Sequence, residues 1–542
     1  MTTERYQLKN KIRIVTAASL FDGHDAAINI MRRILQSSGA EVIHLGHDRS
    51  VEEVVNTAIQ EDANAIAMTS YQGGHNEYFK YMYDLLKERG CEHIRIVGGG
   101  GGVILPEEIK MLQDYGITRI YSPDDGRELG LLGMIDDMLM RCDFKTGMNV
   151  KKEDVASLKK NDKQAIARLI SAAENAPEEN KAVLDKIRKI STVSKTPVLG
   201  ITGTGGAGKS SLVDELIRRF LMATQDSKIA IVSVDPSKRK TGGALLGDRI
   251  RMNAVNNDRV YMRSLATRQS NLALSVYVND TLEILKATDF DLIILETSGI
   301  GQSDTEIEEH SDVSLYVMTP EYGAATQLEK IDMLDFADII ALNKFDKRGA
   351  LDALRDVKKQ YKRNRGMFEA GDDEVPVYGT IASQFNDRGM TELYNAVITE
   401  LNTKAGLTVG DLLSIDGTLA NKSSVIPGAR IRYLSEISEN NRGYDVWVEK
   451  QAQVAQKLYG IHKSIETAKE TSSSVSAELV SQLETLYAEI ELDLDPKNKV
   501  LLEQWATKVQ RYKDPEFKFK VRNKELSIET HSKSLSDSNI AK

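Results

Sequence analysis

The sequence predicts an α/β protein with two parallel-sheet domains in succession and a C-terminal helical region. Two stretches of the chain alternate short apolar runs with amphipathic segments, and the last part of the chain lacks that alternation. The length of 542 residues allows two or three hydrophobic cores. A composition of 41% hydrophobic and 28% charged residues is that of an ordinary globular protein.

The first alternating stretch predicts a doubly wound, Rossmann-like domain, to which we assign residues 1–142. Apolar runs and amphipathic segments follow one another there from Ile12 to about Arg141. Such alternation is typical of strands and helices in a mostly parallel sheet. The segments are 12–18, 26–37, 41–45, 51–60, 65–69 and 94–97.

The rest of the chain divides into a connector, a second α/β domain and a tail. Residues 143–196 have helical spacing without a strand-like run, so we expect a helical connector. The second domain is expected at 197–404 and the helical tail at 405–542. Strand candidates are 198–202, 229–234, 292–296, 313–318 and 339–343; tail helices are expected at 444–488, interrupted by a Ser-rich turn at 471–476, and at 498–512.

Charge and cysteine content exclude several classes of protein. The formal net charge is −9, whereas nucleic-acid binding needs clustered positive charge, so no nucleic-acid partner is expected. Cys91 and Cys142 are too few for a disulfide framework and indicate a reducing compartment. Without a signal-peptide core or an apolar run of about 18 residues, a cytoplasmic location without membrane contact is expected.

A complete P-loop pattern, Gly-Thr-Gly-Gly-Ala-Gly-Lys-Ser, occupies residues 203–210 between a predicted strand and a predicted helix. Its glycines, Gly203 and Gly208 among them, let backbone N–H groups turn toward phosphates at a helix N-terminus. Lys209 would neutralise the outer phosphates, and the hydroxyl of Ser210 can reach Mg²⁺. Ser211 is expected to line the same nucleotide site.

The identity of the base follows from Asn343-Lys344-Phe345-Asp346 at the end of the fifth strand candidate. Asp346 would accept hydrogen bonds from guanine N1–H and N2–H₂, which adenine does not offer. A solvated turn is the alternative for this short pattern. Together with the P-loop it predicts GTP as the nucleotide.

Acidic residues at strand ends are candidates for holding Mg²⁺. Asp235 and Glu296 each close an apolar strand, where P-loop proteins place carboxylates that bind Mg²⁺ or its waters. Asp248 is either a further ligand or an ordinary loop acid. Gly299 is expected to donate its N–H to the γ-phosphate.

His24 is the candidate metal ligand of the first domain. Five of the chain's eight histidines precede residue 95, and His44 and His47 are three apart, so general metal binding is one hypothesis. Only His24 follows a carboxylate, Asp22, by two residues on a turn leaving a strand. That carboxylate can hold the second imidazole nitrogen and raise ligand basicity. A capping histidine is the alternative.

The motif around His24 resembles that of base-off, His-on cobalamin domains, which have Asp-x-His-x-x-Gly, then Ser-x-Leu, then Gly-Gly. The counterparts here are Asp22, His24 and Ala27, then Ser70-Tyr71-Gln72, then residues 98–102. Ala27 and Gln72 depart from the pattern. The resemblance implies that His24 binds cobalt and that Ser70, Gly98 and Gly99 contact the cofactor.

Over essentially its whole length the chain resembles the fused isobutyryl-CoA mutases, through the segments 19–30, 70–75 and 121–127. Its second half is similar to the SIMIBI-type G-proteins that load and protect methylmalonyl-CoA mutase. The resemblance implies adenosylcobalamin, GTP/GDP and Mg²⁺ as ligands. It also implies catalytic roles for Lys209, Asp248 and Glu296, and Mg²⁺ binding by Ser210, Asp235, Asp248 and Glu296. Methylmalonyl-CoA mutases have a lysine four residues before the motif aspartate, where this chain has Ala18, so tuning of the axial ligand is expected to differ.

The family's mutase barrel is expected to be absent from this chain. A (β/α)₈ barrel needs about 250 residues, more than follow Leu401, and residues 531–542 resemble the start of the linker toward it. The chain is then either an excised front half or a separate subunit. Expected partners are the barrel, a second copy in a homodimer and an adenosyltransferase, and expected function is GTP-gated cofactor loading for isobutyryl-CoA isomerisation. The alternatives are a corrinoid carrier or sensor fused to a GTPase, and a metal-delivery GTPase.

Overall fold

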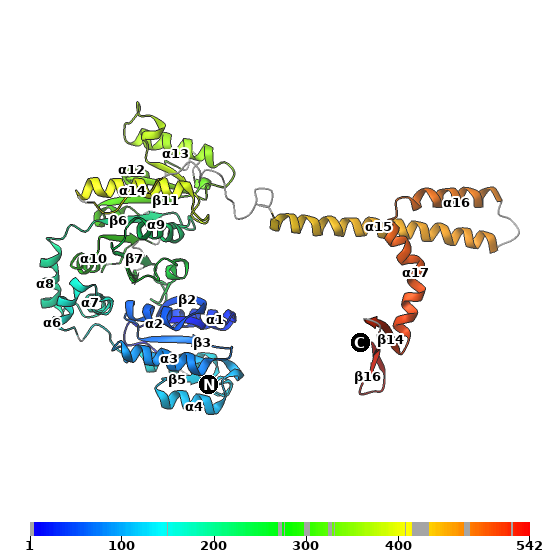
Figure 1. Cartoon of the computed structure of the whole chain (residues 1–542), viewed down its shortest axis with the longest axis horizontal. Helices are drawn as coiled ribbons and strands as arrows, with labels where there is room; N and C mark the ends of the chain where they lie inside the picture. Colours follow the sequence, from blue (N-terminus) through cyan, green and yellow to red (C-terminus); the bar gives the residue numbers. More distant parts are fainter. Residues whose placement is uncertain are drawn as a thin grey trace. The chain divides into compact units, whose positions relative to one another are not determined.

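The described part of the chain forms two compact units, residues 1–421 and 422–542 (Figure 1). The computed structural model describes residues 5–148, 150–268, 274–275, 277–297, 304–322, 328–329, 331–406, 408–414, 433–470, 477–521 and 524–541. The first unit contains both predicted α/β domains. The predicted fold class is therefore confirmed, with two parallel sheets and C-terminal helices.

The first sheet has the strand order β5-β4-β3-β1-β2-β8, with every neighbouring pair parallel. Its central strands are buried along their length because helices cover both faces, as parallel sheets require. The strands are β1 (Arg13–Ser19), β2 (Glu41–Arg49), β3 (Ala65–Thr69), β4 (Arg95–Gly99), β5 (Arg119–Tyr121) and β8 (Ala244–Leu246); the helices are α1 (Asp25–Ser37), α2 (Val51–Gln60), α3 (His75–Glu88), α4 (Pro106–Tyr115) and α5 (Pro123–Cys142).

The edge strand β8 lies far from the others in sequence. It belongs to the stretch predicted as the second domain, yet it pairs with β2 of the first sheet. The first domain is therefore completed by a segment of the second.

The connector predicted at 143–196 is helical, and its helices pack into the core of the second sheet. Ile166, Leu169 and Ile170 are fully buried in the same apolar cluster as strand residues of that sheet. The elements are α6 (Lys152–Ser157), α7 (Lys163–Asn175) and α8 (Lys181–Ser191), with a short 3-10 turn, Leu158–Lys160. These helices are therefore part of the packed second domain and do not form a free linker.

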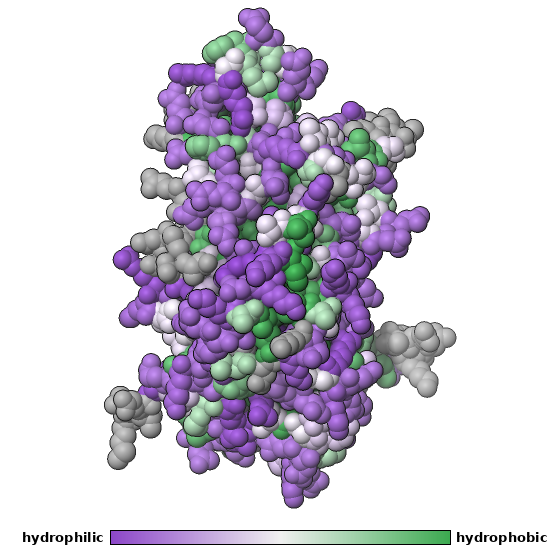
Figure 2. Space-filling model, turned by 90° about the vertical axis from the view of Figure 1, so that its left-hand side faces the viewer, coloured by the Kyte–Doolittle hydropathy of each residue, from purple (hydrophilic) through white to green (hydrophobic). Residues whose placement is uncertain are grey.

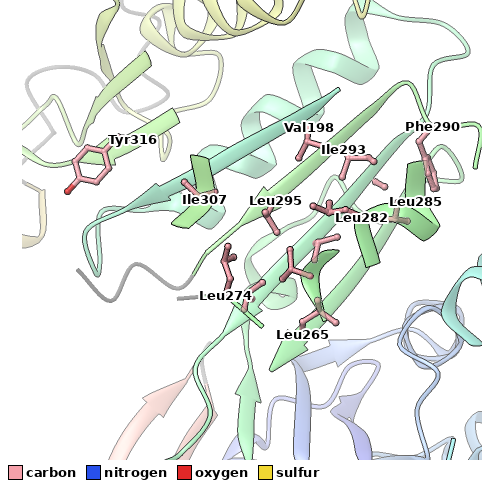
Figure 3. Packing of buried hydrophobic residues seen from close by; sticks show 14 of the residues in the cluster. Val198, Leu265, Leu274, Leu282, Leu285, Phe290, Ile293, Leu295, Ile307 and Tyr316 are labelled. Atoms are coloured by element: carbon pink, nitrogen blue, oxygen red, sulfur yellow. The ribbon is translucent and has the colours of Figure 1, made fainter. Parts of the chain in front are cut away.

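The second sheet has the order β13-β12-β11-β6-β10-β7-β9 and is parallel throughout. Figure 3 shows apolar side chains on one of its faces, among them Val198, Ile293 and Leu295. The strands are β6 (Val198–Gly203), β7 (Ile229–Asp235), β9 (Val260–Ala266), β10 (Leu292–Glu296), β11 (Val313–Met318), β12 (Ile339–Asn343) and β13 (Val377–Thr380); the α-helices are α9 (Lys209–Ala223), α10 (Val278–Lys286), α12 (Met333–Phe336), α13 (Ala350–Asn364) and α14 (Arg388–Ala405), and the 3-10 helices are η3 (Asp248–Arg251), η4 (Asp304–His310), η5 (Pro320–Tyr322) and η6 (Asp372–Glu374).

The second unit contains the predicted tail helices and, in addition, two antiparallel strand pairs. Its helices are α15 (Tyr433–Glu470), α16 (Ala477–Glu491) and α17 (Pro496–Lys513). The predicted C-terminal helices are present, but the helical region does not extend to 542 as expected: after Lys513, β14 (Glu516–Val521) pairs with β15 (Lys524–Glu529) and β16 (His531–Lys533) with β17 (Asn539–Ala541). The Ser-rich turn at 471–476 lies outside the described residues.

The surface is mostly polar on the face that Figure 2 shows, and both cysteines are buried. Of the helices that the structure describes, none is long and apolar enough to cross a membrane. Figure 2 shows one face that is mostly hydrophilic, crossed by a narrow apolar band. Cys91 and Cys142 are buried free thiols, and burial raises their pKa to about 11 and about 12.

Candidate functional site

The P-loop lies where the sequence predicts it, between β6 and α9. Gly203 has φ 149°, and a Cβ there would lie 1.9 Å from the Val317 carbonyl oxygen. Gly208, the residue before α9, has the left-handed φ of 91°. Both positions therefore need glycine, and the turn they allow leaves the N-terminus of α9 facing a cleft of about 440 Å³.

Lys209 and Ser210 are the first residues of α9 and both line this cleft. The Lys209 ammonium donates to the Gly203 carbonyl at 3.0 Å and is largely buried. Ser210 Oγ lies 2.8 Å from Asp248 Oδ1 and 3.1 Å from Glu296 Oε1. The next residue, Ser211, is half-buried on the same wall.

Asp248 and Glu296 lie within hydrogen-bond distance of Ser210, and the third predicted carboxylate, Asp235, lines the same cleft. Desolvation and the neighbouring charge of Asp248 raise the pKa of Asp235 to about 8 and that of Glu296 well above its usual value. Among the described residues, Glu296 Oε2 is buried without a hydrogen-bond partner. Two repelling carboxylates and a hydroxyl supply only part of a coordination shell, so a divalent cation here would need phosphate oxygens and waters as its other ligands.

Asp248 is held by a residue that the sequence analysis missed. Ser233, buried on β7, donates its hydroxyl to Asp248 Oδ2 at 2.6 Å. Arg251, also missed, lines the cleft and is the arginine among its described walls. Ser233 lies two residues before the predicted acid Asp235, and Arg251 lies three residues after Asp248, but spacing alone does not show which neighbouring side chains turn inward.

Two of the residues predicted to recognise the base are hydrogen-bonded to the P-loop. Asn343 Nδ2 donates to the Ala207 carbonyl at 2.8 Å, and Lys344 Nζ donates to the Gly206 carbonyl at 2.8 Å. Asp346 is exposed in the turn that follows β12. These contacts place the motif beside the phosphate loop, as a nucleotide site requires. The remaining predicted residue, Gly299, lies outside the described residues.

His24 directly precedes α1 and presents its ring to solvent, and its side chain makes no capping hydrogen bond to that helix. Its Nδ1 lies 2.8 Å from Asp22 Oδ1, and 63% of the side chain is exposed. Buried Asp22 also accepts the backbone N–H groups of His24 and Tyr71, at 2.9 and 2.7 Å. Burial by itself would raise the pKa of Asp22, but the hydrogen bonds from Tyr71 and His24 outweigh it, so the pKa of Asp22 is lowered. With Nδ1 held, Nε2 is the nitrogen available to a metal.

Ser70 and the glycine run lie next to this histidine. Ser70 Oγ accepts a hydrogen bond from Ser19 at 2.9 Å, and the ring of Tyr71 lies 5.6 Å from that of His24. A Cβ on Gly98 would lie 2.5 Å from the ring of Phe79. Packing against Phe79 therefore requires glycine at position 98 whether or not a cofactor binds there, and the sequence did not indicate this contact.

An apolar cavity of about 220 Å³ opens beside the glycine run, between α1, β3, β4 and α5. Gly98 and Gly99 form part of its wall, so the structure brings them together with the α1 helix that His24 begins. The sequence analysis missed the contribution of α5, although two methionines four residues apart there mark one apolar helix face. The apolar side chains of its lining include Ile28, Met31, Met68, Leu131, Met134 and Met138.

The other histidines of the first domain do not join His24. His44 is buried against Thr16 Oγ at 3.0 Å, and burial lowers its pKa to about 4. His47 is exposed. Within the described ranges, no group of three or more histidine, cysteine or carboxylate residues is arranged to enclose a metal ion.

Known protein families match both α/β parts of the chain. Residues 165–461 match the methylmalonyl Co-A mutase-associated GTPase MeaB family, and residues 12–122 match the B12 binding domain. The chain is 55% identical to the fused isobutyryl-CoA mutase of Geobacillus kaustophilus and 51% identical to that of Cupriavidus metallidurans, over 99% and 98% of its length. It covers 50% and 48% of these proteins, so it spans about half the length of the curated relatives it matches. GTPase ArgK of Escherichia coli is 27% identical over 45% of this chain and 74% of its own.

Proposed function

Because this chain belongs to the MeaB family of methylmalonyl-CoA mutase-associated GTPases and carries a B12-binding domain, we propose that it is the cobalamin-binding GTPase part of an acyl-CoA mutase. The observation that carries this proposal is the presence, in one compact unit, of a P-loop tied to an Asn-Lys-x-Asp motif and of a solvent-facing histidine held by a buried aspartate. Resemblance to fused isobutyryl-CoA mutases supports isobutyryl-CoA and n-butyryl-CoA as the acyl pair.

In the second domain, we propose that GTP lies along the P-loop with its phosphates at the N-terminus of α9. Lys209 would pair with the outer phosphates, and Ser210, Asp235, Asp248 and Glu296 would hold Mg²⁺ directly or through water. Asp346 would bind the guanine edge, and Gly299 would donate to the γ-phosphate. Lys209, Asp248 and Glu296 are the residues to which we assign roles in hydrolysis.

In the first domain, we propose that cobalamin binds with His24 Nε2 toward cobalt and its nucleotide tail in the apolar cavity. Asp22 fixes the tautomer and orientation of His24, and Ser70, Gly98 and Gly99 form the wall along which the tail passes. The apolar lining fits an aromatic base. Adenosylcobalamin, when bound, supplies radical chemistry, and this chain's residues bind and orient it.

We further propose that the substrate site is completed by a mutase barrel on another polypeptide or on the other half of a longer chain. The domain division 1–142, 143–196, 197–404 and 405–542, a homodimer and an adenosyltransferase partner belong to the same proposal. GTP hydrolysis would gate loading and protection of the cofactor. We place this activity in the cytoplasm, where two reduced cysteines are stable.

The test uses the purified chain, adenosylcobalamin and GTP. We expect slow GTP hydrolysis and a cobalamin absorbance change on binding, but no turnover of isobutyryl-CoA until a matching barrel polypeptide is added. Turnover by the chain alone, in protein free of copurifying mutase, would contradict the partner. Retention of a methylated corrinoid without any barrel effect would favour a corrinoid carrier.

A further inference from the structure

The chain between the two proposed magnesium carboxylates Asp235 and Asp248 leaves its own sheet and joins the other one. In this stretch β8 pairs with β2 in parallel, with Glu41 opposite Ala244 and Ile43 opposite Leu246. At the return point, the Gly247 N–H donates to Asp235 Oδ2 at 3.1 Å. The nucleotide site and the first sheet are thus joined by the segment 236–247.

The approach of this segment to the first domain is close. A Cβ on Gly243 would lie 2.1 Å from the Gln36 carbonyl oxygen at the end of α1. Thr241 Oγ1 donates to that same carbonyl at 3.3 Å. The segment therefore has little freedom to shift unless the first domain shifts with it.

Arg249, directly after Asp248, points into the first domain. Its guanidinium is buried and donates to Gln60 Oε1 at 3.1 and 3.0 Å and to Glu61 Oε1 at 3.3 Å, both at the C-terminal end of α2. It also donates to the Met262 carbonyl of β9 at 2.7 Å. Planar guanidinium groups with several fixed acceptors allow little movement.

Asp248 and Arg249 are adjacent in the sequence, but their side chains make contacts in different domains. The carboxylate of Asp248 contacts Ser210 and Ser233 in the nucleotide cleft, while the guanidinium of Arg249 contacts Gln60 and Glu61. Since neighbouring residues share a peptide plane, an anchor on Arg249 restrains the backbone that carries Asp248.

We propose that Arg249 is a positioning residue for GTP hydrolysis, which holds Asp248 at the magnesium site through Gln60 and Glu61 of the first domain. The inference rests on the proposed function of Asp248. It makes α2 of the B12-binding domain part of the support of the nucleotide site. By linkage, a first-domain ligand that moves α2 changes nucleotide affinity, and nucleotide changes that ligand's affinity by the same factor.

The test compares Arg249→Met, Arg249→Lys and Gln60→Ala in the full chain, measuring kcat, KM for GTP and the Mg²⁺ concentration for half-maximal rate. We expect Arg249→Met and Gln60→Ala to lower kcat by roughly tenfold and to raise the Mg²⁺ requirement, because misplacement by about 1 Å has large effects. KM for GTP changes less, since the P-loop and base contacts remain. Arg249→Lys should recover part of the rate.

Tyr261→Phe is the matched control. The Tyr261 hydroxyl donates to the Gln60 carbonyl at 3.1 Å, so this variant removes a bond to the same residue without touching Arg249. We expect its kcat and Mg²⁺ dependence to equal those of the wild type. Equal loss in Tyr261→Phe would show a merely structural interface and overturn the inference.

If Arg249→Met does not fold, Gln60→Ala still tests the inference. In Gln60→Ala the guanidinium of Arg249 stays paired with Glu61 and with the Met262 carbonyl, so we expect this variant to fold. Folded Gln60→Ala with wild-type kcat and Mg²⁺ dependence would overturn the inference alone. A wild-type chain without GTP hydrolysis would instead refute the proposed function, and this inference with it.

Discussion

In the nucleotide cleft, Lys209, Ser210 and three carboxylates already contact one another or the surrounding backbone, whereas in the first domain His24 stands largely in solvent beside an apolar cavity. The nucleotide cleft holds charged groups that a ligand must match with opposite charge. The site in the first domain offers one metal-binding nitrogen, that of His24, and an apolar cavity into which a ligand must fit. We infer that single charges dominate nucleotide binding, while cobalamin affinity is spread over apolar contact and one ligand bond.

The strongest way to break this comparison is Lys209→Ala. Removing the ammonium from the phosphate site should lower GTP hydrolysis by about 100-fold or more, because preorganised charge at phosphates contributes most to such sites. Cobalamin binding, followed by absorbance, should be unchanged. Lys238→Ala, which removes an exposed lysine of the same domain, is the control. A Lys209→Ala chain that keeps its GTPase rate would refute the phosphate role.

Asp346→Asn should produce the next largest effect. The exposed carboxylate is proposed to accept two guanine N–H groups, and an amide matches xanthine better. GTP affinity should fall by roughly tenfold or more, with a gain for xanthosine triphosphate. Competition binding measures both. ATP hydrolysis as fast as GTP hydrolysis in the wild type would defeat the base assignment.

For the cobalamin site, His24→Ala should weaken binding by roughly tenfold, through loss of the lower ligand. GTP hydrolysis without cobalamin should not change. His47→Ala removes an exposed histidine of the same domain and serves as the control. An unchanged affinity and visible spectrum in His24→Ala would exclude it as the axial ligand.

The smallest expected effect sharpens the contrast with the nucleotide site. Gly126 lines the apolar cavity, and a Cβ there would have Met134 at 3.8 Å as its nearest neighbour, so a larger side chain can enter the cavity. Gly126→Leu should weaken cobalamin binding by about fivefold through overpacking. Cobinamide, which lacks the nucleotide tail, should bind as before. Equal loss for both corrinoids would place the tail elsewhere.

Local sequence patterns predicted much of both sites. The P-loop, the Asn-Lys-x-Asp motif and the Asp22–His24 pair each bring together side chains that are a few residues apart or that follow adjacent strands, so their spacing predicted the contacts that the structure shows. The resemblance to fused isobutyryl-CoA mutases is confirmed by relatives that match along nearly the whole chain. The residue roles stay predictions.

Contacts between distant segments could not be predicted in the same way. The strand β8 has only three residues, and its partner β2 lies about 200 positions earlier, so no local periodicity marks it. The buried Arg13 forms ion pairs with Glu61 of its own domain and with Glu174 of the connector helix α7, although each of the three resembles a surface residue in the sequence.

The tail shows a different kind of error. Phe517 pairs with Ile528, and Phe519 with Leu526, at the period-two spacing that is typical of a hairpin. That pattern was present in the sequence, but the preceding amphipathic helices led to a helical interpretation of the whole region. The alternation of Phe517 and Phe519 with charged residues is a strand pattern, and the helical character of the residues before it does not extend into this segment.

The β8–β2 pairing also has a consequence for the order in which the chain is made. About 200 residues separate Arg49 from Ala244, and ribosomes add roughly 5–20 residues per second. The first sheet therefore emerges with the outer edge of β2 unpaired for roughly 10 to 40 seconds before its last strand exists. Unpaired edges invite pairing with other chains, so chaperone protection during synthesis should matter most in that interval.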